Sequence, residues 1–252
     1  MFQRYASADG RGYGAPKFFA MRPNIAILLA GGVGARMGAD QPKQLLTIAG
    51  KTVLEHSLAA FEACPLIDAI AIVVHPSCEA ATQRILQSAP HPKVQHLLLG
   101  GKERADSTLV ALQAYADAEV NLLFHDAVRP AVSQRLIADV CRALQQAEAV
   151  NVVLPAIDTM IEVDPEGRTI AVPDRSRLRR VQTPQGFRRE VLAEAYRRAM
   201  ADPAFRGTDD CGVVFRYLPE VPIALVEGDE SNIKLTYPED LGHLATLLGQ
   251  SL

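Results

Sequence analysis

The stretch ILLAGGVGARMGADQPKQLL, residues 27–46, carries the clearest structural signal in this chain. An apolar run over 24–30 leads directly into glycines and then into basic residues, the order expected of a buried strand followed by a phosphate-binding loop. The stretch satisfies neither common nucleotide-binding pattern. A dinucleotide fingerprint would need glycine where Met37 stands, and a P-loop would need a Gly-Lys-Ser/Thr triplet that no window supplies. We therefore expect a glycine-rich loop of another kind after the first strand.

Apolar runs of strand length recur along the chain with amphipathic stretches between them. We expect strands at 24–30, 67–75, 94–100, 121–126 and 150–156, and helices at 52–63, 77–89, 105–117 and 133–148. Such alternation is typical of an α/β fold with a mostly parallel central sheet flanked by helices. In such sheets ligands bind beyond the carboxyl ends of the strands.

The alternation breaks at residues 158–175. The segment DTMIEVDPEGRTIAVPDR predicts two short strands around a turn at 165–167, a β-hairpin that protrudes from the α/β domain. A lone two-stranded hairpin is marginal in water, so we expect a partner subunit to cover it. A polar helix over 188–201, a strand over 221–228 and a last helix from Pro238 complete the expected fold.

Composition excludes several classes of function. The 252 residues are 48% hydrophobic and 22% charged with a net charge of −3, which fits one large globular domain and argues against a surface built for nucleic acid. The four cysteines form no Cys-x-x-Cys pair, so they indicate neither a zinc site nor a disulfide framework, and they fit a reducing cytoplasm.

The ends of the chain carry no membrane or export signal. No apolar run reaches the ~20 residues that a membrane helix needs, and residues 1–22 lack the apolar core of a secretory signal. We expect residues 1–22 to be a disordered extension and residues 23–252 to form one cytoplasmic domain.

The loop after the first strand combines glycines with cations. Gly31, Gly32 and Gly34 let backbone N–H groups approach phosphate oxygens. Arg36 and Lys43 add positive charge, which suits a triphosphate that loses pyrophosphate better than a stable diphosphate. The alternative for Arg36 and Lys43 is ordinary solvated surface.

Two further loops follow predicted strands. GGKERADS, residues 100–107, can offer backbone groups and the Ser107 hydroxyl to a base, or it can be a plain loop and helix cap. HDAVRP, residues 125–130, places Asp126 at a strand end, as a metal or ribose ligand or as a structural ion pair with Arg129. We interpret His125 as a structural histidine. Lys234, in the alternating run NIKLT, can also be the decoration of an edge strand.

Taken in order, these motifs resemble one family, the 2-C-methyl-D-erythritol 4-phosphate cytidylyltransferases of non-mevalonate isoprenoid synthesis. The resemblance runs from about Asn24 to Leu241 and joins the loops above to the motifs PDRSRLRRVQTPQGF, TDD, NIKLT and TYPEDL. It implies a Rossmann-like nucleotidyltransferase fold and transfer of CMP from CTP to methylerythritol phosphate, with release of pyrophosphate. It also implies a requirement for Mg²⁺, carried mainly on the triphosphate near Asp126.

The resemblance assigns roles to individual residues. The catalytic cations are Arg36, Lys43 and Lys234. The residues of the CTP side are Ala30, Gly31, Gly32, Gly34, Gly101, Ser107 and Asp126. The residues of the sugar-phosphate side are Arg129, Thr159, Arg175, Thr183 and Thr208. The hairpin over 157–176 resembles the arm that crosses to a partner subunit in this family, which implies a homodimer with a shared active site.

Two departures from the family pattern bear on the substrates. Ala35 stands where many members have a second arginine, and Gly31 stands where alanine is usual. Val128 within HDAVRP is the form found in the sister ribitol 5-phosphate cytidylyltransferases, which make CDP-ribitol and are the nearest alternative. A noncatalytic nucleotide-binding module is a more distant one, and an NAD-linked dehydrogenase is disfavoured by the misplaced third glycine.

Overall fold

The computed structural model describes residues 21–32, 41–207 and 209–249. Of the predicted extension, only Met21 and Arg22 fall within these ranges. The predicted site residues Gly34, Arg36 and Thr208 lie outside the described residues.

Within the described residues, the main sheet has seven strands in the order β11-β7-β10-β6-β1-β4-β5. In sequence order these strands are β1 (Asn24–Ala30), β4 (Ala69–Val74), β5 (Val94–Leu99), β6 (Asn121–Asp126), β7 (Ala149–Pro155), β10 (Arg179–Arg188) and β11 (Ile223–Glu227). Among them, β10 runs antiparallel to its neighbours β6 and β7, and the other pairings are parallel. The predicted α/β class with a mostly parallel sheet is confirmed.

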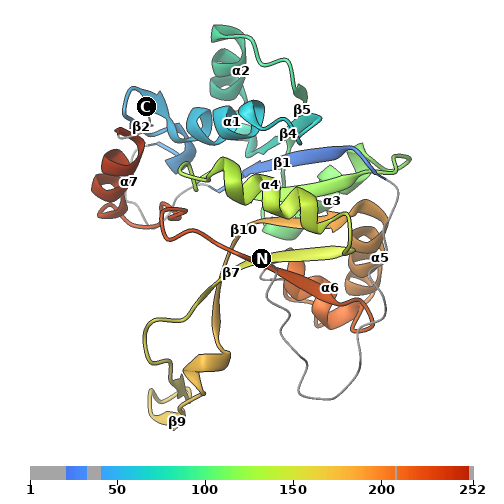
Figure 1. Cartoon of the computed structure of the whole chain (residues 1–252), viewed down its shortest axis with the longest axis vertical. Coiled ribbons are helices and arrows are strands. Elements are labelled where there is room, and N and C mark those ends of the chain that lie inside the picture. The colour runs from blue at the N-terminus through green and yellow to red at the C-terminus, as the bar shows by residue number, and fades with distance from the viewer. Residues whose placement is uncertain (1–20, 33–40, 208, 250–252) are drawn as a thin grey trace.

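Helices cover both faces of the sheet (Figure 1). One face packs against α1 (Val53–Ala63), α2 (Glu79–Ser88) and α4 (Gln134–Ala143) around a core that includes Phe61 and Ile137. The other face packs against α3 (Arg104–Ala114), α5 (Arg189–Met200) and α6 (Asp210–Tyr217) around a core that includes Leu112 and Tyr196. Because both faces are covered, a central strand such as β4 is apolar throughout, and its six residues are all buried.

One strand of the main sheet and one helix that covers it were absent from the sequence prediction. Strand β10 contains Pro184 and Gly186, which break a strand pattern, and its pairing with β7 shifts register between Gln182 and Gly186. Helix α6 has only eight residues, too few for a helical period to stand out. The helix predicted at 133–148 is also too long, since α4 ends at Ala143 and the chain then turns back towards β7.

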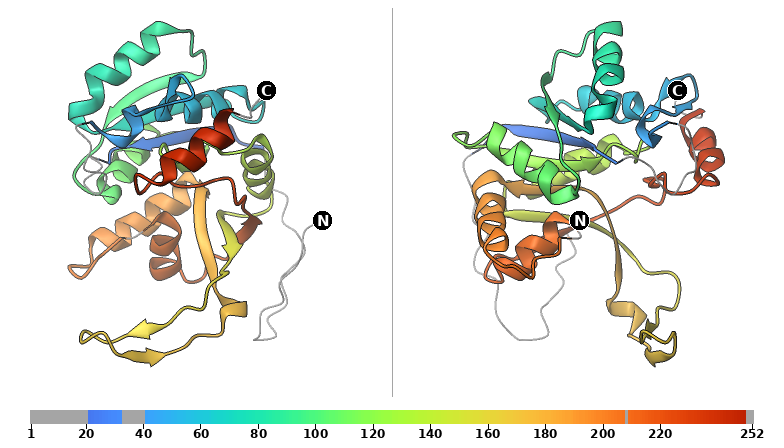
Figure 2. Two further views of the ribbon diagram at one scale, coloured as in Figure 1. Left: turned by 90° about the vertical axis from the view of Figure 1, so that its left-hand side faces the viewer. Right: turned by 180° about the vertical axis from the view of Figure 1, so that it is seen from behind.

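The hairpin arm projects from the sheet as an extension of the β7–β10 pair (Figure 2). Residues 156–178 form it, with β8 (Glu162–Val163) and β9 (Thr169–Ala171) near its tip. Between these strands the chain turns at Gly167, whose φ of 81° lies in the left-handed region that glycine adopts without strain. The predicted hairpin is confirmed.

A separate lobe forms where the C-terminal helix meets the chain between η2 (Lys43–Leu45) and α1. Helix α7 (Asp240–Gly249) packs with the short strands β2 (Thr47–Ile48) and β3 (Lys51–Thr52) around Ile48 and Leu244. The residues before α7 form no strand, so the reading of 232–236 as an edge strand was wrong. Instead, Leu235 N–H donates to Val128 O at 2.8 Å and ties this segment to the loop after β6. None of the helices in the described ranges is long and apolar enough to cross a membrane.

Candidate functional site

A cavity of about 470 Å³ lies at the carboxyl ends of β1, β5 and β6. This cavity, which we call the nucleotide pocket, is lined by Leu29, Ala30, Gly31, Gly32, Lys43, Gln44, Gly101, Lys102, Glu103, Arg104, Ser107, Asp126, Val128, Lys234, Leu235 and Thr236. The predicted site residues that the pocket brings together are Ala30, Gly31, Gly32, Lys43, Gly101, Ser107, Asp126 and Lys234. They come from β1 and the loop after it, from the segment at Lys43, from the loop and helix after β5, from the end of β6 and from the segment at Lys234.

Glycines at and beside the pocket make room for the Ser107 and Asp106 side chains. A side chain at Gly100 would place its Cβ 2.6 Å from Ser107 Oγ, and one at Gly101 would place it 2.4 Å from Asp106 Cβ. A Cβ at Gly31 would lie 3.3 Å from the same hydroxyl, so the glycine found here leaves that hydroxyl less crowded than alanine would. The backbones of the loops that follow β1 and β5 therefore form one narrow wall of the pocket, made of small residues.

Lys43 links the first loop to the C-terminal segment. Its side chain is buried, and its Nζ donates to the carbonyl oxygens of Thr236 at 2.5 Å and Leu235 at 3.5 Å. The neighbouring Gln44 is buried as well and donates to Ala30 O at 2.7 Å. These contacts hold the 3₁₀ helix η2 (Lys43–Leu45) against the end of β1.

The segment that carries Lys234 is fixed by β10. Gln182 Nε2 donates to Asp229 O at 2.8 Å, and Asn232 Nδ2 donates to Thr183 O at the same distance. Arg129 Nη1 also donates to Asn232 O at 2.8 Å. Buried polar side chains thus replace strand pairing as the restraint on this segment, which presents Lys234 to the pocket.

Asp126 is the centre of the charged groups in the pocket. Arg104 Nη1 lies 2.7 Å from its Oδ1, and Lys234 Nζ lies 2.9 Å from its Oδ2. Arg129 Nε lies 3.5 Å from the same Oδ2, so the pairing of Asp126 with Arg129 is present but is the longest of the three. Burial raises the pKa of the Asp126 carboxyl, but the charges of Arg104, Lys234 and Arg129 outweigh burial and hold that pKa well below its usual range.

His125 is a structural histidine, as its sequence position suggested. It is fully buried, and burial lowers its pKa to about 4, so the ring is neutral at pH 7. Its Nε2 lies 3.1 Å from Arg129 O and its Nδ1 lies 3.1 Å from Thr183 Oγ1. Because a carbonyl only accepts, Nε2 carries the proton and Nδ1 accepts from Thr183. Thr183 Oγ1 in turn accepts from Asp126 N–H at 3.0 Å, which orients the strand end that bears Asp126.

The remaining described residues of the predicted sugar-phosphate side divide into two groups. Arg129 and Thr183 are buried beside Asp126 but do not line the pocket. Thr159 and Arg175 are exposed on the arm, where Arg175 Nη1 donates to Ile157 O at 2.8 Å. Within one chain the structure does not bring Thr159 or Arg175 to the nucleotide pocket.

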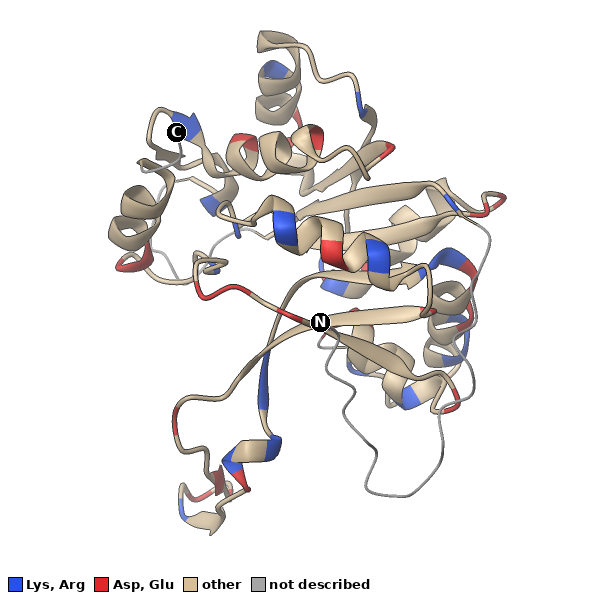
Figure 3. Cartoon of the chain, in the orientation of Figure 1, with Lys and Arg blue, Asp and Glu red and all other residues tan. Residues whose placement is uncertain are grey.

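The arm carries exposed apolar and basic side chains. Among its large apolar residues the exposed ones are Ile157, Met160, Ile161, Val163, Ile170 and Val172, each at least half exposed. The basic residues Arg175, Arg177, Arg179 and Arg180 follow along the root of the arm (Figure 3). The arm therefore presents a mixed surface that the rest of the described chain leaves uncovered.

Sequence reasoning missed five polar residues of the pocket: Thr236, which lies near Lys234, and four that follow predicted strands. Lys102, Glu103 and Arg104 stand within GGKERADS, but a short charged run reads as solvated surface. Gln44 follows Lys43 with no pattern of its own. The position of Gln44, Lys102, Glu103 and Arg104 could have identified them, because each follows a predicted strand at the ligand-binding edge of the sheet.

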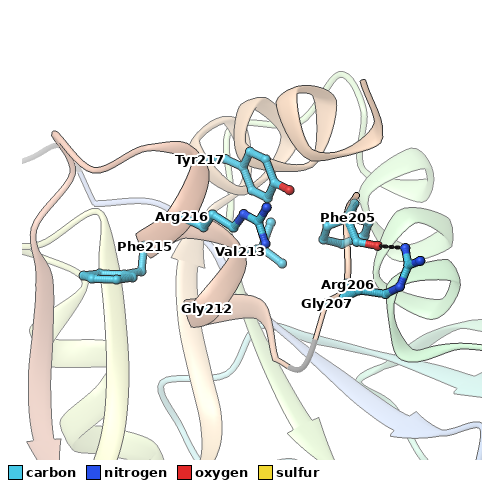
Figure 4. Close-up of a pocket in the computed structure, with 8 residues that line it drawn as sticks. All are labelled: Phe205, Arg206, Gly207, Gly212, Val213, Phe215, Arg216 and Tyr217. Atoms are coloured by element: carbon cyan, nitrogen blue, oxygen red, sulfur yellow. Dashed lines mark hydrogen bonds between the residues drawn. The ribbon is translucent and has the colours of Figure 1, made fainter. Parts of the chain in front are cut away.

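A second cavity, of about 330 Å³, lies between residues 205–207 and α6 (Figure 4). It is lined by Phe205, Arg206, Gly207, Gly212, Val213, Phe215, Arg216 and Tyr217. Among the described residues, it shares no lining residue with the nucleotide pocket and holds none of the predicted site residues. No cluster of three or more His, Cys, Asp or Glu that could hold a metal by itself occurs among the described residues.

Comparison with known proteins gives one consistent family. The IspD family model, described as 2-C-methyl-D-erythritol 4-phosphate cytidylyltransferase, matches residues 24–250. A 2-C-methyl-D-erythritol 4-phosphate cytidylyltransferase of Thermobifida fusca (strain YX) is 50% identical over 234 residues, which cover 90% of this chain and 94% of that protein.

Two further similarities concern the sister activity and the fold. The bifunctional ribulose 5-phosphate reductase/CDP-ribitol pyrophosphorylase Bcs1 of Haemophilus influenzae is 42% identical over 86% of this chain and 46% of that longer protein. The crystal structure of 4-diphosphocytidyl-2C-methyl-D-erythritol synthase from Anaerococcus prevotii DSM 20548 superposes with a TM-score of 0.79. It is 28% identical, over 91% of this chain and 97% of that one.

Proposed function

Because the chain belongs to the 2-C-methyl-D-erythritol 4-phosphate cytidylyltransferase family, we propose that the nucleotide pocket is the place where it transfers CMP from CTP to 2-C-methyl-D-erythritol 4-phosphate. The activity is the cytidylyl transfer of the methylerythritol phosphate route to isoprenoids. The products are 4-diphosphocytidyl-2-C-methyl-D-erythritol and pyrophosphate.

One observation supports this assignment of the pocket more than any other. Lys43 and Lys234 meet at a glycine-lined cavity beside Asp126, although they come from opposite ends of the chain. Cytidylyl transfer brings one phosphate group onto another, so its barrier is dominated by positioning and by repulsion between like charges. Converging cations in a partly enclosed site lower such a barrier.

The chemistry requires no protein nucleophile. An oxygen of the acceptor phosphate forms a bond to the α-phosphorus of CTP, the bond from that phosphorus to the β-phosphate oxygen breaks, and pyrophosphate leaves with the electron pair. The acceptor phosphate is largely dianionic at neutral pH, because its second pKa is about 6. Lys234 stabilises the α-phosphate and Lys43 the triphosphate. Arg36, which lies outside the described residues, joins Lys43 in neutralising the triphosphate, as the family resemblance implies.

The CTP side follows from the small residues of the pocket. Ala30, Gly31 and Gly101 offer backbone groups to cytosine, and the Ser107 hydroxyl lies against the first loop. Gly32, and Gly34 beyond the described residues, leave room for phosphate oxygens. Pyrimidine selection then rests on backbone contacts and on the limited width of this wall.

The pocket suits a magnesium ion that arrives on the nucleotide. Mg²⁺ is commonly held by one or two carboxylates together with substrate phosphates. Asp126 is a carboxylate at the pocket, and its low pKa keeps it ionised. Bound there, Mg²⁺ would supply neutralisation of phosphate charge.

A homodimer would complete the acceptor side. Apolar side chains along the arm are exposed in the single chain, and surfaces of this kind are covered in the native assembly when they are contiguous. A second copy of the chain is the expected cover. Thr159 and Arg175 of the arm would then join Arg129, Thr183 and Thr208 around the sugar phosphate.

A coupled assay of pyrophosphate release tests the function directly. The enzyme is supplied with CTP and Mg²⁺ and with either 2-C-methyl-D-erythritol 4-phosphate or ribitol 5-phosphate. Turnover with methylerythritol phosphate well above that with ribitol phosphate is expected. The reverse preference would reassign the acceptor to the sister activity, and CTP binding without turnover of either acceptor would contradict the catalytic proposal.

A further inference from the structure

Arg104 joins the nucleotide pocket to the interior of the protein. It is the first residue of α3, directly after the glycine turn, and its side chain is 23% exposed. Its Nη1 donates to Asp126 Oδ1 at 2.7 Å, and its Nη2 donates to Asp210 Oδ2 at 2.8 Å. One planar guanidinium thus bridges two carboxylates that belong to β6 and α6.

Asp210 holds Arg104 from the side away from the pocket. It is fully buried and does not line the pocket. Its Oδ1 accepts from Thr108 Oγ1 and from Tyr196 OH, both at 2.8 Å. Helices α3, α5 and α6 therefore fix one carboxylate between them, and that carboxylate fixes the orientation of the guanidinium.

The partners of Asp126 differ in how firmly they are held. Lys234 is 44% exposed and, in the proposed reaction, acts on the α-phosphate. Arg129 lies farther from Asp126, at 3.5 Å, and its Nη1 is bonded to Asn232 O. Arg104 makes the shortest of the three contacts and is anchored at its other end.

We propose that Arg104 is a positioning residue for cytidylyl transfer: anchored by Asp210, it orients the Asp126 carboxylate and stays its partner while Lys234 engages the triphosphate. This inference rests on the proposed function of the pocket. Without Arg104, Asp126 would draw Lys234 back from the phosphates, so the loss would appear in the use of CTP before it appeared in the use of the acceptor.

Asp210→Asn is the most informative variant, because it changes no side chain that lines the pocket. The amide oxygen can still accept from Thr108 and Tyr196, and this orientation turns the amide NH₂ group towards Arg104. Both groups are then donors, so the hydrogen bond that holds Arg104 is lost. The expected result is a fall of about 10-fold in kcat/KM for CTP, the size typical of losing an outer partner of a reactive group, with KM for the acceptor within about twofold.

Two other variants separate positioning from stability. Tyr196→Phe removes a donor to the opposite oxygen of Asp210 and is expected to lower Tm while leaving kcat/KM for CTP within about twofold. Arg104→Lys keeps the charge but cannot bridge both carboxylates, so it should lose at least as much as Asp210→Asn. The double variant Arg104→Lys with Asp210→Asn should lose no more than the worse single variant, because both act through one contact.

The experiment measures steady-state kinetics for both substrates and the Kd of CTP by calorimetry, at a temperature well below the lowest Tm. Asp210→Asn with a reduced Tm but wild-type kcat/KM would overturn the inference, and so would losses that multiply in the double variant. If the wild type binds CTP but turns over no acceptor, the proposed function fails. In that case the Kd of CTP, measured across the variants, tests the positioning role of Arg104 by itself. Weaker CTP binding in Asp210→Asn would support that role, and unchanged binding would refute it.

Discussion

The nucleotide pocket and the hairpin arm are organised in opposite ways. In the pocket, charge is buried and paired, since Asp126 is nearly enclosed by three cationic side chains. In the arm, apolar surface is exposed, with Ile170 at 63% and Val172 at 64%, and the ladder between β8 and β9 is very short. The described lining of the pocket comes from one chain, whereas the arm leaves its apolar surface uncovered. We propose that each chain builds its own CTP site and that the acceptor site needs a second copy.

Removal of Mg²⁺ has the largest expected effect. Among the described residues that line the pocket, Asp126 and Glu103 are the carboxylates, and no cluster of three metal-ligating side chains occurs in the described ranges, so we expect the protein alone to hold the metal weakly. We expect chelation with EDTA to abolish measurable pyrophosphate release and added Mg²⁺ to restore it. Full turnover in the presence of excess chelator would show that the cations of the chain suffice.

Loss of either pocket lysine comes next. Lys43→Ala and Lys234→Ala each remove a positive group from the proposed phosphate position, and we expect turnover to fall about 10²–10³-fold. Lys51→Ala, on the exposed strand β3, is the matched control and should retain wild-type activity. Circular dichroism and Tm establish that the variants fold. A rate near that of the wild type in Lys234→Ala would remove this lysine from the mechanism.

A charged substitution on the arm tests whether a second copy of the chain covers the arm and completes the acceptor site. Ile170→Asp places a carboxylate in the apolar surface of the arm, and we expect a monomer by sedimentation with CTP binding retained. Acceptor kcat/KM should fall about 10²-fold, because groups from the second arm would no longer position the sugar phosphate. Phe215→Asp, at an apolar residue of α6 that is 74% exposed, is the control. A fully active Ile170→Asp monomer would contradict a shared site.

The neutral His125 predicts a pH dependence of stability. Its folded pKa of about 4 lies below the usual 6.5, so the unfolded chain takes up the proton first as the pH falls. The stability gained by keeping His125 neutral in the folded protein is present in full above about pH 6.5. As the pH falls from there to about 4, the free energy of unfolding decreases progressively, by roughly 3 kcal/mol in total.

Urea unfolding of His125→Gln between about pH 4.5 and 7 checks this sign, because the variant keeps a donor for Arg129 O but has no titration. Its free energy of unfolding should fall less steeply with acid than that of the wild type. His243→Gln, at an exposed position on α7, should leave the slope unchanged. Equal slopes for wild type and His125→Gln would show that His125 is not held neutral.

Much of the fold could be predicted because most parallel strands are buried on both faces and therefore consist of long apolar runs. Strands β1 and β6 match their predicted bounds for this reason. Strand β10 was not predicted because it buries polar residues instead of forming an apolar pattern: Gln182 bonds the 229–232 segment, and Gln185 donates to Asn151 and Asp209. Tertiary hydrogen bonds of this kind leave no local signal.

The candidate site was predictable where a residue follows a strand and otherwise only through the family resemblance. Asp126 ends a strand and Lys43 lies in the connection after β1, whereas Lys234 lies in a run whose alternation indicates a strand that does not form. Arg104 was missed because its importance lies in two partners, Asp126 and Asp210, that are remote in sequence. Nothing in GGKERADS distinguishes a bridging arginine from a solvated one.

The most direct test of the account is a crystal structure of the protein with CTP and Mg²⁺. We expect the triphosphate in the nucleotide pocket, with the Nζ atoms of Lys43 and Lys234 within hydrogen-bond distance of phosphate oxygens and Asp126 still bonded to Arg104. A triphosphate bound elsewhere, or one from which both lysines point away into solvent, would contradict the claim that these cations neutralise the reacting phosphates.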